Sequence, residues 1–302
     1  MDERPLRAYR GVMQIRKPMF ATMVLALASW SAHAATEGAR FVSMGSSYAA
    51  GPGVGVHDAA SGDCGRSLSN YARTVAQRRG LALVDVACSG ATTENILVRG
   101  QNGFPAQIEA VTPDTRLVAF LIGGNDIGYV GDLFGFSCRS EGKGACQVSS
   151  TAQLAQRLAE LPGKLDRVID AVRRRAPDAR IVMVGYLPAV AQDAGACPQL
   201  PLALADADRM RDTTARLTQV FEATAARKHV DLVHAAALGA GHEVCAAAGY
   251  VTGYHPARVE SWREPVAYHP NQAGMDRIAQ DLEAILGFSA DRGPRTSPST
   301  GK

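Results

Sequence analysis

The chain has 302 residues, of which 46% are hydrophobic and 20% charged, a composition that suits one large domain with a buried core. Residues 1–34 hold five of the 32 Lys and Arg residues and two of the 29 Asp and Glu residues, so the remainder carries 27 charges of each sign. Because this remainder is neutral, the net charge of +3 gives no support to a nucleic-acid-binding surface, and we expect no nucleic-acid partner.

The first 34 residues have the pattern of an export signal peptide. Basic residues precede an apolar stretch, Met19–Trp30, and Ala32-His33-Ala34 then places small residues at the two positions that a signal peptidase reads. Spanning a bilayer takes about 20 apolar residues, so this stretch is too short for a transmembrane anchor. We predict cleavage after Ala34 and a secreted or periplasmic protein. The long basic region leaves both Met1 and Met13 as possible starts of translation.

Short apolar runs alternate with amphipathic segments along the rest of the chain. The apolar runs predict buried strands at Phe41–Met44, Leu81–Ala87, Leu117–Ile122, Ile181–Tyr186 and Leu232–His234. The amphipathic segments predict helices at Ser69–Arg79 (with Ser69 as the N-cap), Thr151–Arg175, Leu204–Arg227 and Asn271–Leu286. This alternation is typical of a parallel sheet with helices on both faces, which binds its ligands beyond the carboxyl ends of the strands.

The last residues and the cysteines complete the domain prediction. Ser289–Lys302 is polar and rich in Pro and Ser, which predicts a disordered tail after a single domain over residues 35–288. All six cysteines follow residue 34, and an even number in an exported chain indicates disulfides. Six cysteines allow 15 pairings, among which the sequence does not choose. Neither C-x-x-C nor H-x-x-x-H spacing occurs, so we expect no metal site.

Four short segments carry the residue types that hydrolysis at an acyl carbonyl requires: a nucleophile, a base and donors to the oxyanion. The segments are Gly45-Ser46-Ser47-Tyr48, Ser89-Gly90-Ala91, Gly124-Asn125-Asp126 and His269-Pro270-Asn271. Three of them begin near the end of a predicted strand, and the fourth precedes the last predicted helix. Each segment alone also fits an ordinary turn or cap, so the prediction depends on all four occurring together.

The residues of these segments have distinct predicted roles. Ser47 is the predicted nucleophile and His269 the general base, because Pro270 keeps the histidine out of the helix that follows. The N–H groups of Ser47 and Gly90 and the side-chain amide of Asn125 are the predicted oxyanion donors. Asp126, Trp262 and Tyr268 lie near the motifs and receive no chemical role.

In their order and surroundings, the four segments resemble the SGNH (GDSL-type) hydrolases, over about Arg40 to Leu286. Ser47 matches the family serine, whereas Ser46 stands where the family usually has aspartate, which leaves two adjacent hydroxyls. The resemblance implies a flavodoxin-like three-layer α/β/α sandwich with a mainly parallel five-stranded sheet. It also implies an esterase or lipase that works through an acyl-serine without a cofactor.

The family commonly places an aspartate three residues before the histidine, but this chain has Val266 there. In some secreted actinobacterial members a backbone carbonyl at that position replaces the acid. The resemblance therefore implies that the Val266 carbonyl orients His269, with the side chain of Glu264 as the alternative. Those members also pair their cysteines sequentially, which implies Cys64–Cys88, Cys138–Cys146 and Cys197–Cys245.

The sequence therefore predicts an exported esterase or lipase, monomeric, acting on a small-molecule or lipid ester. Two alternatives stay open: an acyltransferase that uses the same site, and a non-catalytic binding module on the same scaffold. The acyl and headgroup preference is expected to depend on the loops at residues 51–67 and 134–149, which sequence patterns do not resolve.

Overall fold

Five parallel strands form one sheet in the order β2-β1-β3-β4-β5. The computed structural model describes residues 38–191, 197–255, 262 and 264–287. The predicted signal peptide and the predicted tail lie outside these residues. The strands are β1 (Arg40–Gly45), β2 (Ala82–Asp85), β3 (Thr115–Leu121), β4 (Arg180–Val184) and β5 (Asp231–Val233). All five coincide with the apolar runs predicted as strands, and all four pairings are parallel.

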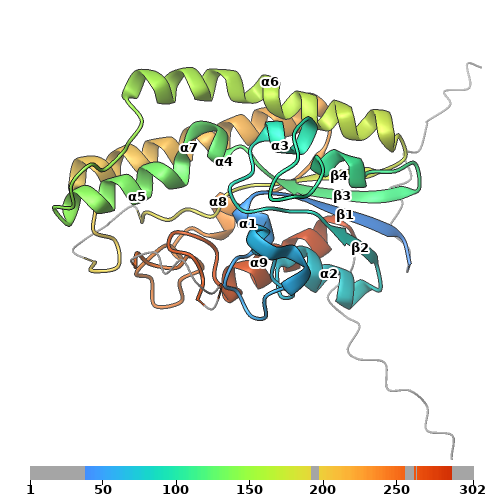
Figure 1. Ribbon diagram of the computed structural model, residues 1–302, viewed down its shortest axis with the longest axis horizontal. Coiled ribbons are helices and arrows are strands. Elements are labelled where there is room, and N and C mark those ends of the chain that lie inside the picture. The colour runs from blue at the N-terminus through green and yellow to red at the C-terminus, as the bar shows by residue number, and fades with distance from the viewer. Residues whose placement is uncertain (1–37, 192–196, 256–261, 263, 288–302) are drawn as a thin grey trace, which may run out of the picture. The chain divides into compact units, whose positions relative to one another are not determined.

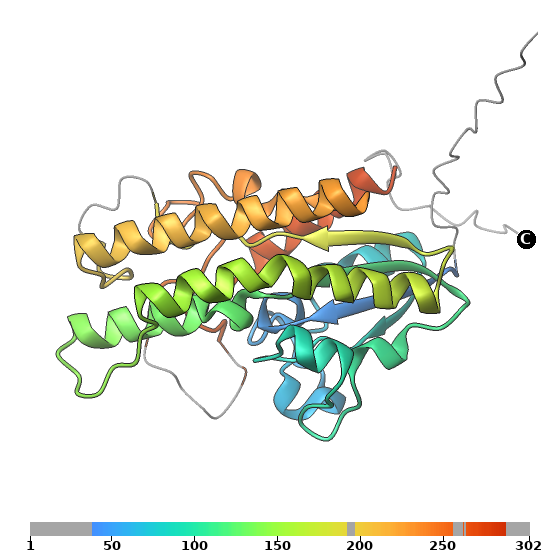
Figure 2. The same cartoon turned by 90° about the horizontal axis from the view of Figure 1, so that it is seen from above.

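Helices cover both faces of the sheet, as Figure 1 shows. The helices α2 and α9 lie on one face, and α6 and α7 on the other, where Figure 2 shows them side by side. The long helices are α2 (Tyr71–Arg79), α5 (Tyr129–Ser140), α6 (Thr151–Arg175), α7 (Leu204–Lys228) and α9 (Gln272–Ile285). The one-turn helices are α1 (Ser47–Ala50), α3 (Thr93–Leu97), α4 (Gly124–Ile127) and α8 (Ala235–Leu238). This is the three-layer α/β/α sandwich that the resemblance implies.

Burial of the central strands explains why they read as unbroken apolar runs. From Phe41 to Gly45 every residue of β1 is buried, and so is every residue of β3 except Arg116. A parallel strand covered on both faces has no solvent side, so the polar alternation of a half-exposed strand is missing. The edge strands β2 and β5 are only partly buried.

The helix starts follow from side-chain caps. The prediction of Ser69 as the cap of α2 is wrong, because the side chain of Asn70 accepts the N–H of Arg73 and the helix begins at Tyr71. Both residue types are good caps, so composition does not decide between neighbours. Asn271 caps α9 by accepting the N–H of Gly274 at 3.0 Å. This cap fixes the chain just after His269.

Helix α5 begins inside a region that sequence patterns left without structure, and it covers the first part of the loop expected at residues 134–149. Two glycines, two serines and a cysteine give it little intrinsic helix propensity. Packing compensates, because the side chains of Leu133 and Phe136 are fully buried. Among the helices of the described residues, none is long and apolar enough to span a membrane.

Candidate active site

The turn from β1 into α1 presents Ser47 at the carboxyl edge of the sheet. Gly45 ends the strand at φ 146°, and a Cβ there would lie 2.4 Å from the carbonyl oxygen of Leu121 on β3. Only glycine permits this close approach. The next residue, Ser46, donates its N–H to the same Leu121 oxygen at 3.0 Å. The turn is therefore held tightly against β3, and Ser47 becomes the first residue of α1.

Ser47 and His269 meet across 222 residues of sequence. The Oγ atom of Ser47 lies 2.7 Å from Nε2 of His269, and both residues are buried, with 8% and 4% of their surface exposed. The neighbouring hydroxyl is engaged elsewhere, because Ser46 forms a side-chain hydrogen bond with Tyr186. The geometry therefore separates the two adjacent serines and pairs the histidine with Ser47.

The group that orients His269 is a different carbonyl from the one predicted. Nδ1 of the ring lies 2.8 Å from the carbonyl oxygen of Ala267. The Val266 carbonyl instead accepts the backbone N–H of His269 at 3.1 Å, which closes a turn, so the expectation of Val266 is wrong. The alternative, Glu264, is exposed. A carbonyl oxygen only accepts, so Nδ1 carries the proton and Nε2 is free to accept from the Ser47 hydroxyl.

Aromatic packing encloses the imidazole. The ring of Tyr48 lies 4.8 Å from that of His269, and its hydroxyl donates to the carbonyl of Tyr268. Tyr268 itself has φ 63°, a left-handed conformation that directs the neighbouring histidine inward. Burial lowers the pKa of His269 to about 4, against a smaller raising effect of the bond to Ala267. The ring is therefore neutral, and competent as a base, at neutral pH.

The three predicted oxyanion donors lie in adjoining turns at this edge. As the first residue of α1, Ser47 has no acceptor for its N–H within the helix. Within the described residues, no backbone carbonyl accepts the N–H of Gly90, which has φ 82°. One N–H of the Asn125 amide donates to the carbonyl of Ala91 at 2.9 Å, and the other is left for a substrate oxygen. That bond joins the segments of Gly90 and Asn125.

Two side chains that sequence patterns missed hold these turns together. Gln107 is buried and bonds both backbone groups of Gly45: its Oε1 accepts the N–H at 2.7 Å, and its Nε2 donates to the carbonyl at 2.9 Å. The carboxylate of Asp126 accepts the N–H and the hydroxyl of Thr93 at 3.0 and 2.5 Å. Gln107 lies outside every motif. Asp126 lies inside one, but its partner is 33 residues away.

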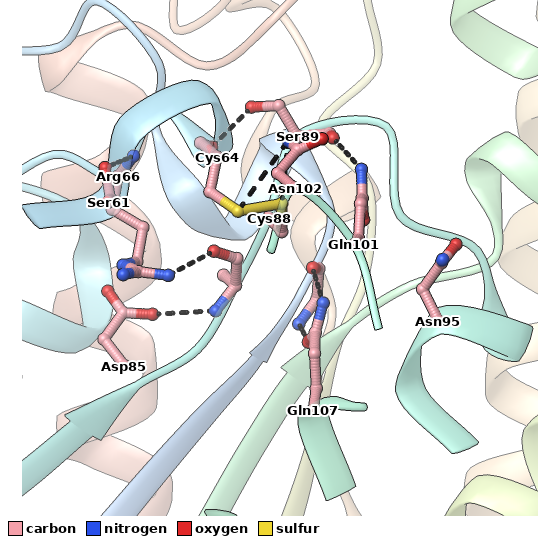
Figure 3. Close-up of a disulfide and its surroundings, with 12 residues drawn as sticks. Ser61, Cys64, Arg66, Asp85, Cys88, Ser89, Asn95, Gln101, Asn102 and Gln107 are labelled. Atoms are coloured by element: carbon pink, nitrogen blue, oxygen red, sulfur yellow. Dashed lines mark hydrogen bonds between the residues drawn. A yellow bond between two sulfur atoms is a disulfide. The ribbon is translucent and has the colours of Figure 1, made fainter. Parts of the chain in front are cut away.

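The disulfide Cys64–Cys88 lies next to the oxyanion segment, as Figure 3 shows. Ser89 donates both its N–H and its hydroxyl to the Cys64 carbonyl, at 3.0 and 2.9 Å, and its own carbonyl accepts from Gln101 at 2.6 Å. Gly90 is thus preceded by a residue fixed on both sides. The other disulfides join Cys138 to Cys146 and Cys197 to Cys245, so all three pairs are those that the resemblance implies.

Comparisons with known proteins find a matching family model and similar lipases. Residues 43–277 match the model of the GDSL-like Lipase/Acylhydrolase family. Lipase 2 of Streptomyces coelicolor is 31% identical to the chain, over an alignment that covers 94% of the chain and 99% of that lipase.

Two solved structures resemble the fold along nearly their full length. The extracellular lipase of Streptomyces rimosus is 30% identical with a TM-score of 0.66, over 81% of this chain and 98% of its own. Phospholipase A1 of Streptomyces albidoflavus is 28% identical with the same TM-score, over 82% and 99%.

Proposed function

The chain belongs to the GDSL-like Lipase/Acylhydrolase family and is a carboxylic ester hydrolase, and from this premise we propose that Ser47 and His269 carry out the hydrolysis through an acyl-serine. The observation that carries the proposal is the 2.7 Å contact between Ser47 Oγ and His269 Nε2. This contact lies within the range of a nucleophile hydrogen-bonded to its base. The tautomer set by the Ala267 carbonyl leaves Nε2 as the acceptor.

The reaction proceeds in two acyl transfers. In the first, Nε2 of His269 takes the proton of Ser47, Oγ attacks the ester carbonyl, and the departing alcohol receives the proton from the imidazolium. In the second, His269 deprotonates water, which attacks the acyl-serine; the acid is released as the imidazolium returns the proton to Ser47 Oγ. In both steps the oxyanion accepts hydrogen bonds from the N–H groups of Ser47 and Gly90 and from the Asn125 amide, each worth roughly 3–4 kcal/mol.

The Ala267 carbonyl replaces the carboxylate of a catalytic triad. Its partial negative charge fixes the imidazole orientation and stabilises the imidazolium less than a full charge would. The site compensates through rigidity, because the carbonyl belongs to a turn closed by the bond from His269 N–H to Val266. Neither step draws on a metal ion or an organic cofactor.

We also propose that the protein acts outside the cytoplasm. Three disulfides support this location, since such bonds persist in oxidising compartments. The signal-like residues 1–34 support it too, as does the extracellular location named for the Streptomyces rimosus lipase. Edman sequencing of the protein from the culture medium or periplasm tests this part. A first residue of Ala35 supports it, and a chain that still carries the residues up to Ala34 contradicts it.

The catalytic part is tested with two matched serine variants and p-nitrophenyl butyrate. Ser47→Ala removes the nucleophile and is expected to lower kcat by at least about 10⁴-fold, because the loss of either the nucleophile or its base removes the catalysis that the pair provides. Ser46→Ala changes the adjacent hydroxyl and should retain activity within about tenfold of the wild type. Circular dichroism confirms that both variants fold. Turnover of the Ser47 variant at the wild-type rate rejects the proposal.

A further inference from the structure

A groove of about 440 Å³ between α3 and α6 has Asn125, one of the proposed oxyanion donors, in its lining. Figure 1 shows the two helices next to each other on the same side of the sheet. We call this cavity the α3/α6 groove, and the lining residues used below are Glu94, Asn125, Asp126, Arg157, Lys164 and Arg167. The proposed hydrolytic mechanism assigns no role to its cations.

Three cationic side chains from one helix face line the groove. Arg167 is exposed and has no anionic partner within the part of the chain that the structure describes. The partner of Arg157 is neutral: its guanidinium donates to the hydroxyl of Ser149 at 3.0 Å. Lys164 forms ion pairs with Asp126 at 3.6 Å and with Glu160 at 3.8 Å. Among the described residues of the lining, the positive charge that no carboxylate pairs is therefore that of the two guanidinium groups, Arg157 and Arg167.

Both carboxylates in the lining have a cationic partner. The side chain of Asp126 is only 3% exposed; it pairs with Lys164, and its oxygens also accept the N–H and hydroxyl of Thr93. Glu94 forms a 2.9 Å ion pair with Arg99, which is not part of the lining. The three cations of the lining outnumber its two carboxylates. An anion entering the groove thus meets a net positive surface.

These cations lie close to the residue that is to bind the oxyanion. Lys164 contacts Asp126, the residue after Asn125. Nη1 of Arg157 is 3.1 Å from the position that a Cβ of Gly128 would take, and Gly128 ends the one-turn helix α4 that carries Asn125. Two cations therefore flank the helix that carries Asn125, the proposed oxyanion donor that also lines the groove.

We propose that the α3/α6 groove binds a phosphate group carried by the substrate, so that acyl esters bearing a phosphate are preferred over their neutral counterparts. This inference rests on the proposed function, because it places the phosphate relative to an ester carbonyl at Ser47. Guanidinium groups suit phosphate particularly well, since two parallel N–H donors match two phosphate oxygens. Lys164 adds a point charge. The phosphate is anchored while the acyl carbonyl lies between Ser47 and Asn125.

The test compares two soluble substrates that differ only in the phosphate: 1,2-dibutyroylglycerol 3-phosphate and 1,2-dibutyroylglycerol. The wild-type enzyme is expected to have a kcat/KM at least about tenfold higher for the phosphorylated ester, mainly through a lower KM. The double variant Arg157→Gln/Arg167→Gln should lose most of this preference, because it removes both guanidinium groups. The control variant Arg174→Gln/Arg175→Gln removes two exposed cations from the same helix, outside the groove. It should keep the preference.

Two results overturn the inference: a wild-type enzyme without preference for the phosphorylated ester, and a preference that survives the Arg157/Arg167 change. Equal losses in both double variants also contradict it, because they indicate general attraction to a basic helix rather than a subsite. Inactivity of the wild type toward both esters and toward p-nitrophenyl butyrate counts against the proposed function instead.

Calorimetry with the Ser47→Ala variant tests the groove without turnover. The phosphorylated ester should bind at least about tenfold more tightly than the neutral ester, and replacing Arg157 and Arg167 should remove the difference. Inorganic phosphate serves as the second arm of this titration. If it binds as tightly as the phosphorylated ester, the groove is a site for free phosphate, and the substrate subsite is rejected.

Discussion

The groups that orient the ring of His269 are close to it in sequence, whereas those that fix the oxyanion turns are far apart in sequence. Around His269, the orienting groups come from the preceding turn, where Ala267 and Val266 accept the two N–H groups of the histidine. Around Gly90 and Asn125, the contacts join distant segments: Gln107 bonds Gly45, and Asp126 bonds Thr93.

The surroundings of His269 set its pKa, whereas the contacts around Gly90 and Asn125 set the positions of the oxyanion donors. The base side is enclosed by buried aromatic rings, and burial is the main cause of the lowered pKa of His269. The oxyanion side is a network of hydrogen bonds and a disulfide, which fixes the positions of donors rather than their charge. Changes on the base side should therefore alter the pH dependence, whereas changes on the oxyanion side should lower kcat at every pH.

The largest effect within the oxyanion side is expected from Asn125→Ala. Loss of one donor to the oxyanion lowers kcat by roughly 100- to 1000-fold with little change in KM, because the bond forms mainly in the transition state. Steady-state kinetics with p-nitrophenyl butyrate measures it. Asn125→Asp is the matched variant: it keeps the shape, lacks the donor, and should be at least as impaired. A wild-type kcat in either variant would show that Asn125 does not donate to the oxyanion.

Replacement of Gln107 by Leu tests whether a residue outside every motif positions the nucleophile. The change leaves the buried N–H of Gly45 without its acceptor, which costs about 1–3 kcal/mol of unfolding free energy. Displacement of the Ser47 turn should lower kcat by roughly 10- to 100-fold.

Thermal unfolding and kinetics are measured together, with the exposed Gln156→Leu on α6 as the control. A stability loss without a change in kcat would show that Gln107 serves only the fold.

The disulfides test the oxyanion side, because Cys64 of the Cys64–Cys88 pair binds Ser89, the residue before Gly90. Removing Cys64–Cys88 or Cys138–Cys146 by paired Cys→Ala changes opens loops of 24 or 8 residues, and each costs about 2–4 kcal/mol of stability. Only the first pair should also lower kcat, by roughly tenfold, since Ser89 and Gly90 lose their anchor. Assays at 15 °C keep both variants folded. Equal kcat values in the two variants contradict the anchoring role.

The smallest change is expected between pH 7 and pH 5. Protonation of Nε2 removes the base, so activity is lost as the pH falls through the pKa of His269, which burial lowers to about 4. The value of kcat/KM at pH 5 should therefore lie within about twofold of that at pH 7, whereas a histidine at the usual pKa of about 6.5 would lose about 25-fold. The measurement is the dependence of kcat/KM on pH with a neutral ester. A loss of activity with its midpoint near pH 6.5 would contradict the lowered pKa of the buried His269.

Much of the fold followed from the sequence, because its strong signals are local. Short apolar runs located all five strands, and the amphipathic pattern located α6 with both of its ends. Helix α5 was missed because tertiary packing of Leu133 and Phe136, rather than propensity, stabilises it. The cap of α2 was misplaced by one residue between Ser69 and Asn70, two good capping types.

The candidate site was predictable in its residue types and less so in its supports. Each of the four segments has a recognisable residue pattern, and the structure brings Ser47 and His269 together. The orienting carbonyl was assigned to Val266 rather than Ala267, because every residue offers a carbonyl and only the geometry of the turn selects one. The role of Gln107 could not be predicted, because no sequence pattern distinguishes a buried glutamine that bonds a distant backbone from other glutamines.

Labelling with a fluorophosphonate, followed by peptide mapping, tests the central claim most directly. The account predicts a single phosphonyl adduct on Ser47 in the wild-type protein and at least about a 100-fold slower labelling rate in His269→Ala, because the base no longer takes the serine proton. An adduct on Ser46, or labelling of Ser47 at an unchanged rate without His269, would contradict it.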